Sequence, residues 1–328
     1  MVTLQSGIIG TGSSYPDRIL TNFDLEKMVD TSDEWITTRT GIKERHIAAE
    51  GEFTSQFASR AALTAIERAG IKPEQLDLII CATVTPDQIL PSTACLIQAE
   101  IGANKAAAFD LAAACSGFIY GATLADQMIK SGQIKYALVI GAELLTRFVD
   151  YTDRGTCVIF GDGAGAAVMG PVNNGKGILA SRIRSDGRFA EQLYAPGGGT
   201  RTGTTPETIR NKLHFFKMRG NELFKVAVRS MTDISREVLD AAGKSSDDIA
   251  LVIPHQANQR ITNAVGEKLG IGQEKLYSNI AYFGNTSSAS IPIALDECVV
   301  QSKIKPGDLL LMTSFGGGVT WGALLMEW

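Results

Sequence analysis

Three side chains in this sequence are of the types that acyl-transfer chemistry requires. Cys115 stands in DLAAACSGFIYG, where small residues on both sides clear space around the thiol. His255 follows an apolar run typical of a strand, and Asn285 lies in the small-residue turn YFGNTSSAS. A thiolate is a natural nucleophile for exchange with thioesters. A neutral imidazole and an amide can donate to one oxyanion, and each donor is worth about 2.7–4 kcal/mol in a transition state. The three residues therefore form a candidate catalytic set.

The position of Cys115 predicts how its thiol would be activated. A helical pattern over 116–130 begins directly after it. A helix N-terminus carries roughly +0.5 charge and free N–H groups, and such surroundings lower the pKa of a thiol. We therefore expect a thiolate at Cys115. The glycine run SFGGGVTWG at 314–322 follows a predicted strand and can bring a backbone N–H to a second oxyanion.

The remaining candidate residues have structural interpretations. Five cysteines without a CxxC pair form neither a disulfide framework nor a zinc site. Structural roles are assigned to the other four, which are Cys81, Cys95, Cys157 and Cys298. His46 and His214 lie in charged or flexible contexts and are expected at the surface. The segment FGDGAGAAVMG at 160–170 mimics a dinucleotide motif, but Gly-Pro ends it before a helix could form, so a nucleotide site is excluded there.

Composition indicates a soluble cytoplasmic protein. The 328 residues are 45% hydrophobic and 20% charged, with a net charge of −4, which suits two ordinary domains or one large α/β unit. The charge gives no reason to expect nucleic acid. No apolar run approaches the roughly 18 residues of a membrane span, and the N-terminus lacks the pattern of a signal peptide. We expect no contact with nucleic acid or membrane.

Short apolar runs alternate with helical patterns along the chain, which is typical of α/β layers. Continuous apolar residues predict buried strands at 77–84, 136–143, 250–255 and 308–315. Helices are predicted over 55–70 and 220–243, each closed by a glycine.

A repeat underlies this alternation. AGIKPEQLDLIICAT at 69–83 aligns with AGKSSDDIALVIPHQ at 242–256, at a shift of 173 residues (242 − 69), and two further pairs of segments match in the same order. We therefore predict a duplicated α/β unit with halves at 1–172 and 173–328. Two packed copies would place equivalent loops face to face, which would gather the catalytic set at a pseudo-twofold axis.

Six segments together resemble the β-ketoacyl-acyl carrier protein synthase III family. They are TSDEWITTRTGIKERHI (31–47), AAACSGF (112–118), FGDGAGA (160–166), HQANQRI (255–261), GNTSSAS (284–290) and FGGGVTWG (315–322). The resemblance runs along essentially the whole chain. It implies an α/β thiolase-like fold with a duplicated five-layer αβαβα architecture, in agreement with the repeat.

The resemblance implies a decarboxylating Claisen condensation that starts fatty-acid synthesis. Cys115 would take the acyl group of an acyl-CoA primer. His255 and Asn285 would then hydrogen-bond the thioester carbonyl of malonyl-acyl carrier protein as CO2 leaves. The backbone N–H groups of Cys115 and Gly317 would hold the oxyanion of the tetrahedral intermediates. No metal or other cofactor is implied, since decarboxylation supplies the driving force.

The resemblance also assigns residues to substrate binding in a homodimer. CoA would contact Trp35, Arg39, Thr40, Arg154, Asn221 and Asn258, with the adenine between Trp35 and Arg154. The acyl pocket would be lined by Met218, Phe224, Phe315 and a Leu90 from the partner subunit. An acidic carrier protein would dock on Lys225, Gln256, Arg260 and Lys268. The glycine-rich segment 194–210 is expected to border the acyl pocket.

Two other functions stay open at this point. A thiolase-fold relative of secondary metabolism would form the same acyl-cysteine but use another acyl-CoA or another acceptor. A non-catalytic acyl-CoA-binding protein would keep the fold without acylation of Cys115. The sequence does not identify the length or type of the primer's acyl chain.

Overall fold

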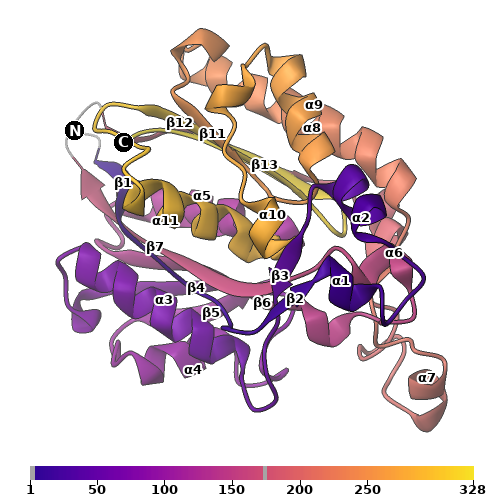
Figure 1. Ribbon diagram of the computed structural model, residues 1–328. Helices are drawn as coiled ribbons and strands as arrows, with labels where there is room; N and C mark the ends of the chain where they lie inside the picture. The colour runs from indigo at the N-terminus through magenta and orange to yellow at the C-terminus, as the bar shows by residue number, and fades with distance from the viewer. Residues whose placement is uncertain (1–3, 173–175) are drawn as a thin grey trace.

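The computed structural model describes residues 4–172 and 176–328 and contains two central sheets (Figure 1). The strands of the first sheet are β1 (Gln5–Ser14), β4 (Leu78–Ala82), β5 (Ala107–Leu111), β6 (Ala137–Leu144) and β7 (Asp162–Val172). They lie in the order β1-β7-β6-β4-β5. β4 is parallel to β5 and β6, whereas β7 is antiparallel to β1 and β6.

The second sheet takes its strands from the later part of the chain. They are β8 (Gly177–Ser185), β11 (Leu251–Pro254), β12 (Leu309–Gly316) and β13 (Thr320–Glu327), in the order β11-β12-β13-β8. β11 and β12 are parallel, and the other pairs are antiparallel. Two small sheets pair β2 (Ile19–Thr21) with β3 (Glu44–His46) and β9 (Leu193–Tyr194) with β10 (Lys217–Met218).

Helices complete five layers (Figure 1). The outer face of the first sheet is covered by α3 (Thr54–Arg68) and α4 (Thr93–Glu100), and that of the second by α8 (Gly220–Ala241) and α9 (Gln259–Leu269). The helices α5 (Gly117–Lys130) and α11 (Ser290–Val300) lie between the two sheets. The predicted helix–sheet–helix–sheet–helix order is therefore confirmed.

Within the described residues, five further helices of four to eight residues lie outside this core. They are α1 (Asn22–Leu25), α2 (Asp33–Thr40), α6 (Arg154–Cys157), α7 (Pro206–Arg210) and α10 (Ile280–Phe283). Four of them gather at one end of the layers, while α7 projects away from the rest (Figure 1). An apolar core fills each space between neighbouring layers. Phe118 and Leu295 represent the central core, Phe57 the core under α3, and Val238 the core under α8.

The predicted elements appear at their expected places. The four apolar runs form β4, β6, β11 and β12, because strands covered by helices on both faces must be apolar throughout. The two predicted helices are α3 and α8, and the glycines that follow them, Gly70 and Gly243, have φ of 66° and 63°. Segment 160–170 enters the strand β7 rather than a helix, as the exclusion of a nucleotide site required. The division at 172 and 173 stays a prediction, and residues 173–175 lie outside the described residues.

The two central helices begin in the same way. A 3-10 turn at Ala114–Ser116 precedes α5, and another at Ser287–Ala289 precedes α11. The first residue of each turn is left-handed, with φ of 46° at Ala114 and 50° at Ser287. Non-glycine residues adopt this conformation at a cost and mostly where surrounding structure enforces it. The two positions differ by 173 residues (287 − 114), the shift seen in the sequence repeat.

Candidate active site

A cavity of about 600 Å³ connects the catalytic set with the surface. Cys115, His255 and Asn285 line it and are buried, whereas Arg39 and Lys225 line it and are exposed. The three predicted catalytic residues come from the first 3-10 turn, the end of β11 and the loop before the second 3-10 turn. The fold therefore brings together side chains that lie 140 (255 − 115) and 30 (285 − 255) residues apart in sequence.

Cys115 is held against the end of β12. A Cβ atom on Gly316 would lie 2.8 Å from the backbone nitrogen of Cys115, so only glycine permits this approach. Burial raises the pKa of the Cys115 thiol to about 11, and the Ser287 side chain and the N–H groups of Gly317 and Cys115 offset this only in part. The expected lowered pKa is wrong, because loss of water around the sulfur outweighs these donors. The free protein therefore holds a thiol.

Two hydrogen bonds hold His255 in place. Its backbone N–H donates to the carbonyl of Thr313 at 2.8 Å, and its Nδ1 lies 2.7 Å from the hydroxyl of Ser290. The side chain is 2% exposed. Burial lowers the pKa of His255 to about 3, so the imidazole is neutral at physiological pH. With Nδ1 engaged, Nε2 is the ring nitrogen that can meet a substrate.

Asn285 is oriented by its own turn. Its Oδ1 accepts from the backbone N–H of Ser287 at 2.8 Å. Its backbone N–H donates to Ile159 at 2.9 Å, and its carbonyl accepts from Gly161 at 3.0 Å. Because Oδ1 is held, the two N–H donors of the amide are the groups that can serve an anionic ligand. The site therefore offers hydrogen-bond donors from two neutral side chains beside one thiol.

The predicted adenine site is closed in this structure. Trp35 and Arg39 lie on α2, and Arg154 begins α6. Both guanidinium carbons stand 4.8 Å from the centre of the Trp35 ring. Arg154 also donates to the carbonyl of Asp30 at 2.8 Å. A purine between Trp35 and Arg154 would require about 7 Å, two contacts of about 3.5 Å each. The predicted sandwich is thus replaced by direct contact of its two walls.

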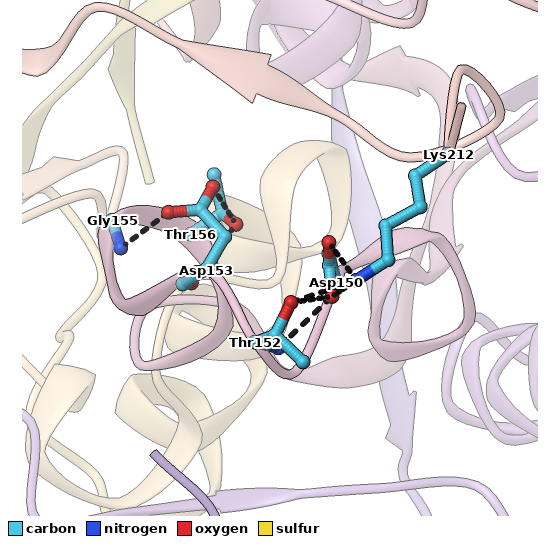
Figure 2. Close-up of polar contacts among 6 residues, drawn as sticks. All are labelled: Asp150, Thr152, Asp153, Gly155, Thr156 and Lys212. Atoms are coloured by element: carbon cyan, nitrogen blue, oxygen red, sulfur yellow. Dashed lines mark hydrogen bonds and ion pairs between the residues drawn. The ribbon is translucent and has the colours of Figure 1, made fainter. Parts of the chain in front are cut away.

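The loop that carries Arg154 is shaped by two carboxylates, drawn in Figure 2. Asp153 accepts from the N–H of Gly155 and the hydroxyl of Thr156, both at 2.9 Å, and so caps α6. Asp150 accepts from the N–H and hydroxyl of Thr152 and from Lys212, whose Nζ lies 2.8 Å from Oδ2. Burial raises the pKa of Asp150, but the bonds from Lys212 and Thr152 outweigh it and hold the pKa at about 2.

Lys212 comes from the segment after α7, so this ion pair joins the base of the glycine-rich region to the α6 loop. No residue of 194–210 lines the cavity, although Leu193 and Met218 at its two flanks do. The expectation that this segment borders the pocket is therefore wrong. Its residues instead pair with one another, as in the bonds between Thr205 and Thr208.

Other predicted residues fall at the cavity wall. Thr40, Met218, Phe224, Asn258, Arg260, Phe315 and Gly317 line it together with Lys225. Asn258 caps α9 and donates to the carbonyl of Arg39 at 3.0 Å, which ties α9 to α2. The Arg260 guanidinium stacks over Phe224 at 5.5 Å. Arg154 and Lys268 do not line the cavity, and the side chain of Asn221 lies outside the described part of the structure.

One predicted docking residue is buried instead of exposed. Gln256 is 1% exposed and cannot meet a carrier protein, because its amide bonds to the carbonyls of Pro254 and Tyr277 and to the N–H of Asn279. Leu90 is 83% exposed and does not line this chain's cavity, so its expected place in the pocket of a partner subunit stays a prediction.

Two interpretations of single residues also change. Cys95 is exposed rather than buried in the core. His46 is half-buried, since it packs on Tyr15 and Phe283, and burial lowers its pKa.

Sequence reasoning missed the residues that support the catalytic set. Ser287 and Ser290 touch it but lie in a serine-rich turn that shows no periodic signal. Apolar residues of the wall, such as Ile159, Phe160 and Leu223, belong to elements whose burial pattern does not mark a pocket. Residues 4–172 and 176–328 contain no group of three metal-ligating side chains. Across these same ranges, every helix is too short or too polar to cross a membrane.

Comparison with known proteins identifies the family to which this chain belongs. A family model described as 3-oxoacyl-[acyl-carrier-protein] synthase III matches residues 109–187, and its C-terminal counterpart matches 239–328. A β-ketoacyl-[acyl-carrier-protein] synthase III of Symbiobacterium thermophilum is 53% identical over 98% of both chains. This chain belongs to the synthase III family. It is therefore an acyl-transferring condensing enzyme of the β-ketoacyl-acyl carrier protein synthase III type.

Solved structures agree with this family. The synthase III of Aquifex aeolicus is 54% identical, with a TM-score of 0.92 over 98% of this chain and 100% of that one. The likeness confirms the thiolase-like fold. The priming β-ketosynthase of the R1128 polyketide pathway is 32% identical, with a TM-score of 0.91 over 100% of this chain and 98% of that one.

Proposed function

We propose that Cys115, His255 and Asn285 divide the condensation into an acylation and a decarboxylation. The observation that carries the proposal is the single cavity that holds all three side chains and also reaches the exposed Arg39 and Lys225. A thioester with a long arm could enter at the exposed residues and present its carbonyl to the buried ones.

In the first step the Cys115 sulfur attacks the carbonyl carbon of the acyl-CoA. The backbone N–H groups of Cys115 and Gly317 both act to lower the pKa of the sulfur, which supports their role as donors to the oxyanion that this attack creates. The bond to the CoA sulfur then breaks. The proton of the Cys115 thiol ends on the released CoA, which leaves an acyl-cysteine.

In the second step malonyl-acyl carrier protein replaces CoA in the cavity. Nε2–H of His255 and Nδ2–H of Asn285 donate to its thioester carbonyl, where negative charge develops as the bond to CO2 breaks. The carbanion attacks the acyl group on Cys115, and the cysteine sulfur leaves. The product is a 3-oxoacyl-carrier protein, and the cysteine thiolate takes a proton from water to recover its thiol.

Substitution of the nucleophile tests this division. Cys115→Ser should abolish condensation, because an alkoxide at neutral pH is far scarcer than a thiolate. Cys95→Ser is the matched control, since Cys95 is exposed and does not line the cavity. Intact-protein mass measured after exposure to acetyl-, branched, medium-chain and aromatic acyl-CoAs would identify the primer. Substantial condensation by Cys115→Ser would refute the assignment.

We propose that CoA and the carrier protein use the exposed end of the cavity. Trp35, Arg39 and Arg154 would hold the nucleotide of CoA once Arg154 has moved. Lys225 and Arg260 are exposed at the cavity wall and, with the exposed Lys268, supply positive charge for an acidic carrier protein. Gln256 is buried and is therefore not part of this docking surface.

We further propose a homodimer formed across the edge of the first sheet. β5 is an edge strand whose side chains are exposed or half-buried, including Phe109. Ile89 and Leu90, 92% and 83% exposed, provide apolar side chains that a soluble monomer rarely leaves open. Sedimentation at micromolar concentration should give twice the chain mass, and a monomer would refute the proposal.

The competing function is the priming of secondary metabolism, as the name of the R1128 relative describes for that protein. Both functions share the acyl-cysteine, so acylation does not separate them. Efficient condensation with malonyl-acyl carrier protein from fatty-acid synthesis favours the first, and success only with another acceptor favours the second.

A further inference from the structure

The hydroxyl of Ser290 has two partners with different hydrogen-bonding abilities. Ser290 is the first residue of α11, and its Oγ lies 2.7 Å from Nδ1 of His255. The backbone nitrogen of Gln256 lies 3.4 Å from the same oxygen. Both side chains of the pair are buried, each 2% exposed. Within the described residues the hydroxyl makes no other hydrogen bond.

The direction of these bonds follows from the chemistry of the groups. A backbone N–H can only donate, so the Ser290 oxygen is the acceptor toward Gln256. If Nδ1–H donated to the same oxygen, the buried hydroxyl hydrogen would have no acceptor among the described residues, so the arrangement that satisfies every group directs this hydrogen at Nδ1 of His255. Nδ1 therefore accepts a hydrogen bond and carries no proton of its own.

The backbone N–H of Gln256, which donates to Ser290, is itself held in place. The side-chain amide of Gln256 donates to the carbonyl of Pro254 at 2.7 Å, and its Oε1 accepts from the N–H of Asn279 at 3.1 Å. These bonds anchor the residue next to His255 and hold its backbone N–H toward α11. Gln256 thus has a structural use in place of the docking role expected from the sequence.

We propose that Ser290 is a positioning residue that holds His255 as its Nε2–H tautomer, with Nε2–H directed into the cavity as a hydrogen-bond donor. The neutral ring has one proton, and Ser290 leaves only Nε2 to carry it. A ring in this form can donate to a thioester oxygen but cannot accept the proton of Cys115. Ser290 would therefore assign His255 to the decarboxylation step, a role that rests on the proposed function.

Nitrogen NMR of the unliganded protein tests the tautomer directly. The chain has three histidines, so 15N-histidine labelling gives few signals, and His255→Gln identifies the pair that belongs to His255. We expect a protonated Nε2 and an unprotonated Nδ1. A protonated Nδ1 in the wild-type protein would overturn the proposal, whatever the behaviour of any Ser290 variant.

Substitution of Ser290 tests whether its hydroxyl determines the tautomer of His255. Ser290→Ala should shift His255 toward a mixture of tautomers, and Ser290→Thr, which keeps the hydroxyl, should restore the Nε2–H form. Ser288→Ala is a matched control, because the Ser288 hydroxyl lies against Ala82 and Glu143 and not against His255. This variant should leave the tautomer unchanged. An unchanged tautomer in Ser290→Ala would overturn the assignment.

The two half-reactions provide a second readout. Ser290→Ala should slow CO2 release from malonyl-acyl carrier protein by about 10–100-fold, the range found when a hydrogen bond that orients a metal-bound histidine is lost. Acylation of Cys115 by acyl-CoA should stay within a few-fold. Equal losses in both steps would indicate general disruption and would contradict the proposal. Because the NMR test uses no substrate, failure of the proposed function, seen as activity in Cys115→Ser, is distinguishable from failure of this one.

Discussion

Cys115 is a buried thiol rather than a preformed thiolate, and this determines how it reacts with reagents. Its pKa of about 11 means that the thiolate fraction rises about tenfold for each pH unit through the neutral and alkaline range. In a Cys95→Ser background, the rate of alkylation of Cys115 by iodoacetamide should therefore keep increasing above pH 9. Peptide mass spectrometry measures the rate, with Cys115→Ala as the blank. A plateau below pH 8 would restore the lowered pKa expected from the sequence.

His255 and Asn285 should be dispensable for the first half-reaction. Neither side chain is among the groups that lower the pKa of Cys115. His255→Ala and Asn285→Ala should therefore still be acylated by acyl-CoA, yet release CO2 from malonyl-acyl carrier protein on the order of 10²–10³-fold more slowly. Mass measurement of the acyl-enzyme and a labelled-CO2 assay follow the two steps. If His255→Ala also loses acylation, the imidazole takes the thiol proton and the division of roles is wrong.

The meeting of Cys115, His255 and Asn285 in one cavity could be predicted from residue types at strand ends and helix starts. The contacts that support these three residues could not be predicted in this way. Ser290 is one of several serines in the same turn, and only the packing of α11 against β11 selects it for His255. The pKa of Cys115 depends on how completely water is excluded, which no sequence pattern expresses. Gln256 resembles an exposed polar residue, but nearby backbone groups satisfy its amide inside the protein.

At the scale of elements, the end of β12 positions the turn that holds Cys115. A methyl group on Gly316 would stand 2.8 Å from the nitrogen of Cys115 and 3.1 Å from that of Ser116. Gly316→Ala should therefore displace the turn and reduce acylation on the order of 10²-fold, since a displacement of about 1 Å can cost that much.

The control for this substitution is Gly187→Ala, where an added methyl group meets nothing within 4 Å. Single-turnover acylation monitored by mass spectrometry measures both variants, and circular dichroism checks that each is folded. Wild-type acylation by Gly316→Ala would mean that the turn tolerates a wider spacing from β12.

The elements of the core were more predictable than those at the cavity mouth. Strands covered on both faces must be apolar, so β4, β6, β11 and β12 are visible as runs in the sequence. The α6 loop instead depends on local bonds from Asp150 and Asp153 and on the distant Lys212. Such bonds form between polar residues that look exposed in sequence, so neither the loop nor the closed adenine site was foreseen.

At the scale of the whole molecule, Asp162 links stability to pH. It lies at the start of β7 and accepts from the N–H and hydroxyl of Thr146 and the N–H of Ala48. Burial nevertheless raises its pKa from 3.8 to about 6. The folded state therefore binds more protons than the unfolded state between about pH 4 and 6. The contribution of Asp162 to the free energy of unfolding falls as pH rises through this window and stays constant above it.

Asp162→Asn removes this titration. The free energy of unfolding of wild type minus that of the variant should be about 2 kcal/mol lower at pH 7 than at pH 4.5. Urea unfolding of both proteins at the two pH values measures it. An equal difference at both values would show that the carboxyl of Asp162 is ionised throughout.

The contact between Trp35 and Arg154 also sets an upper limit on the rate of CoA binding. At the proposed CoA site, adenine would enter between them only after Arg154 has left the ring and the carbonyl of Asp30, so we expect CoA binding to have an opening step before the encounter is complete. Trp35 is one of three tryptophans, and the other two do not line the cavity. Its fluorescence should therefore report the event. In stopped-flow mixing the observed rate should level off at high CoA concentration, whereas in Arg154→Ala it should continue to rise in proportion to CoA.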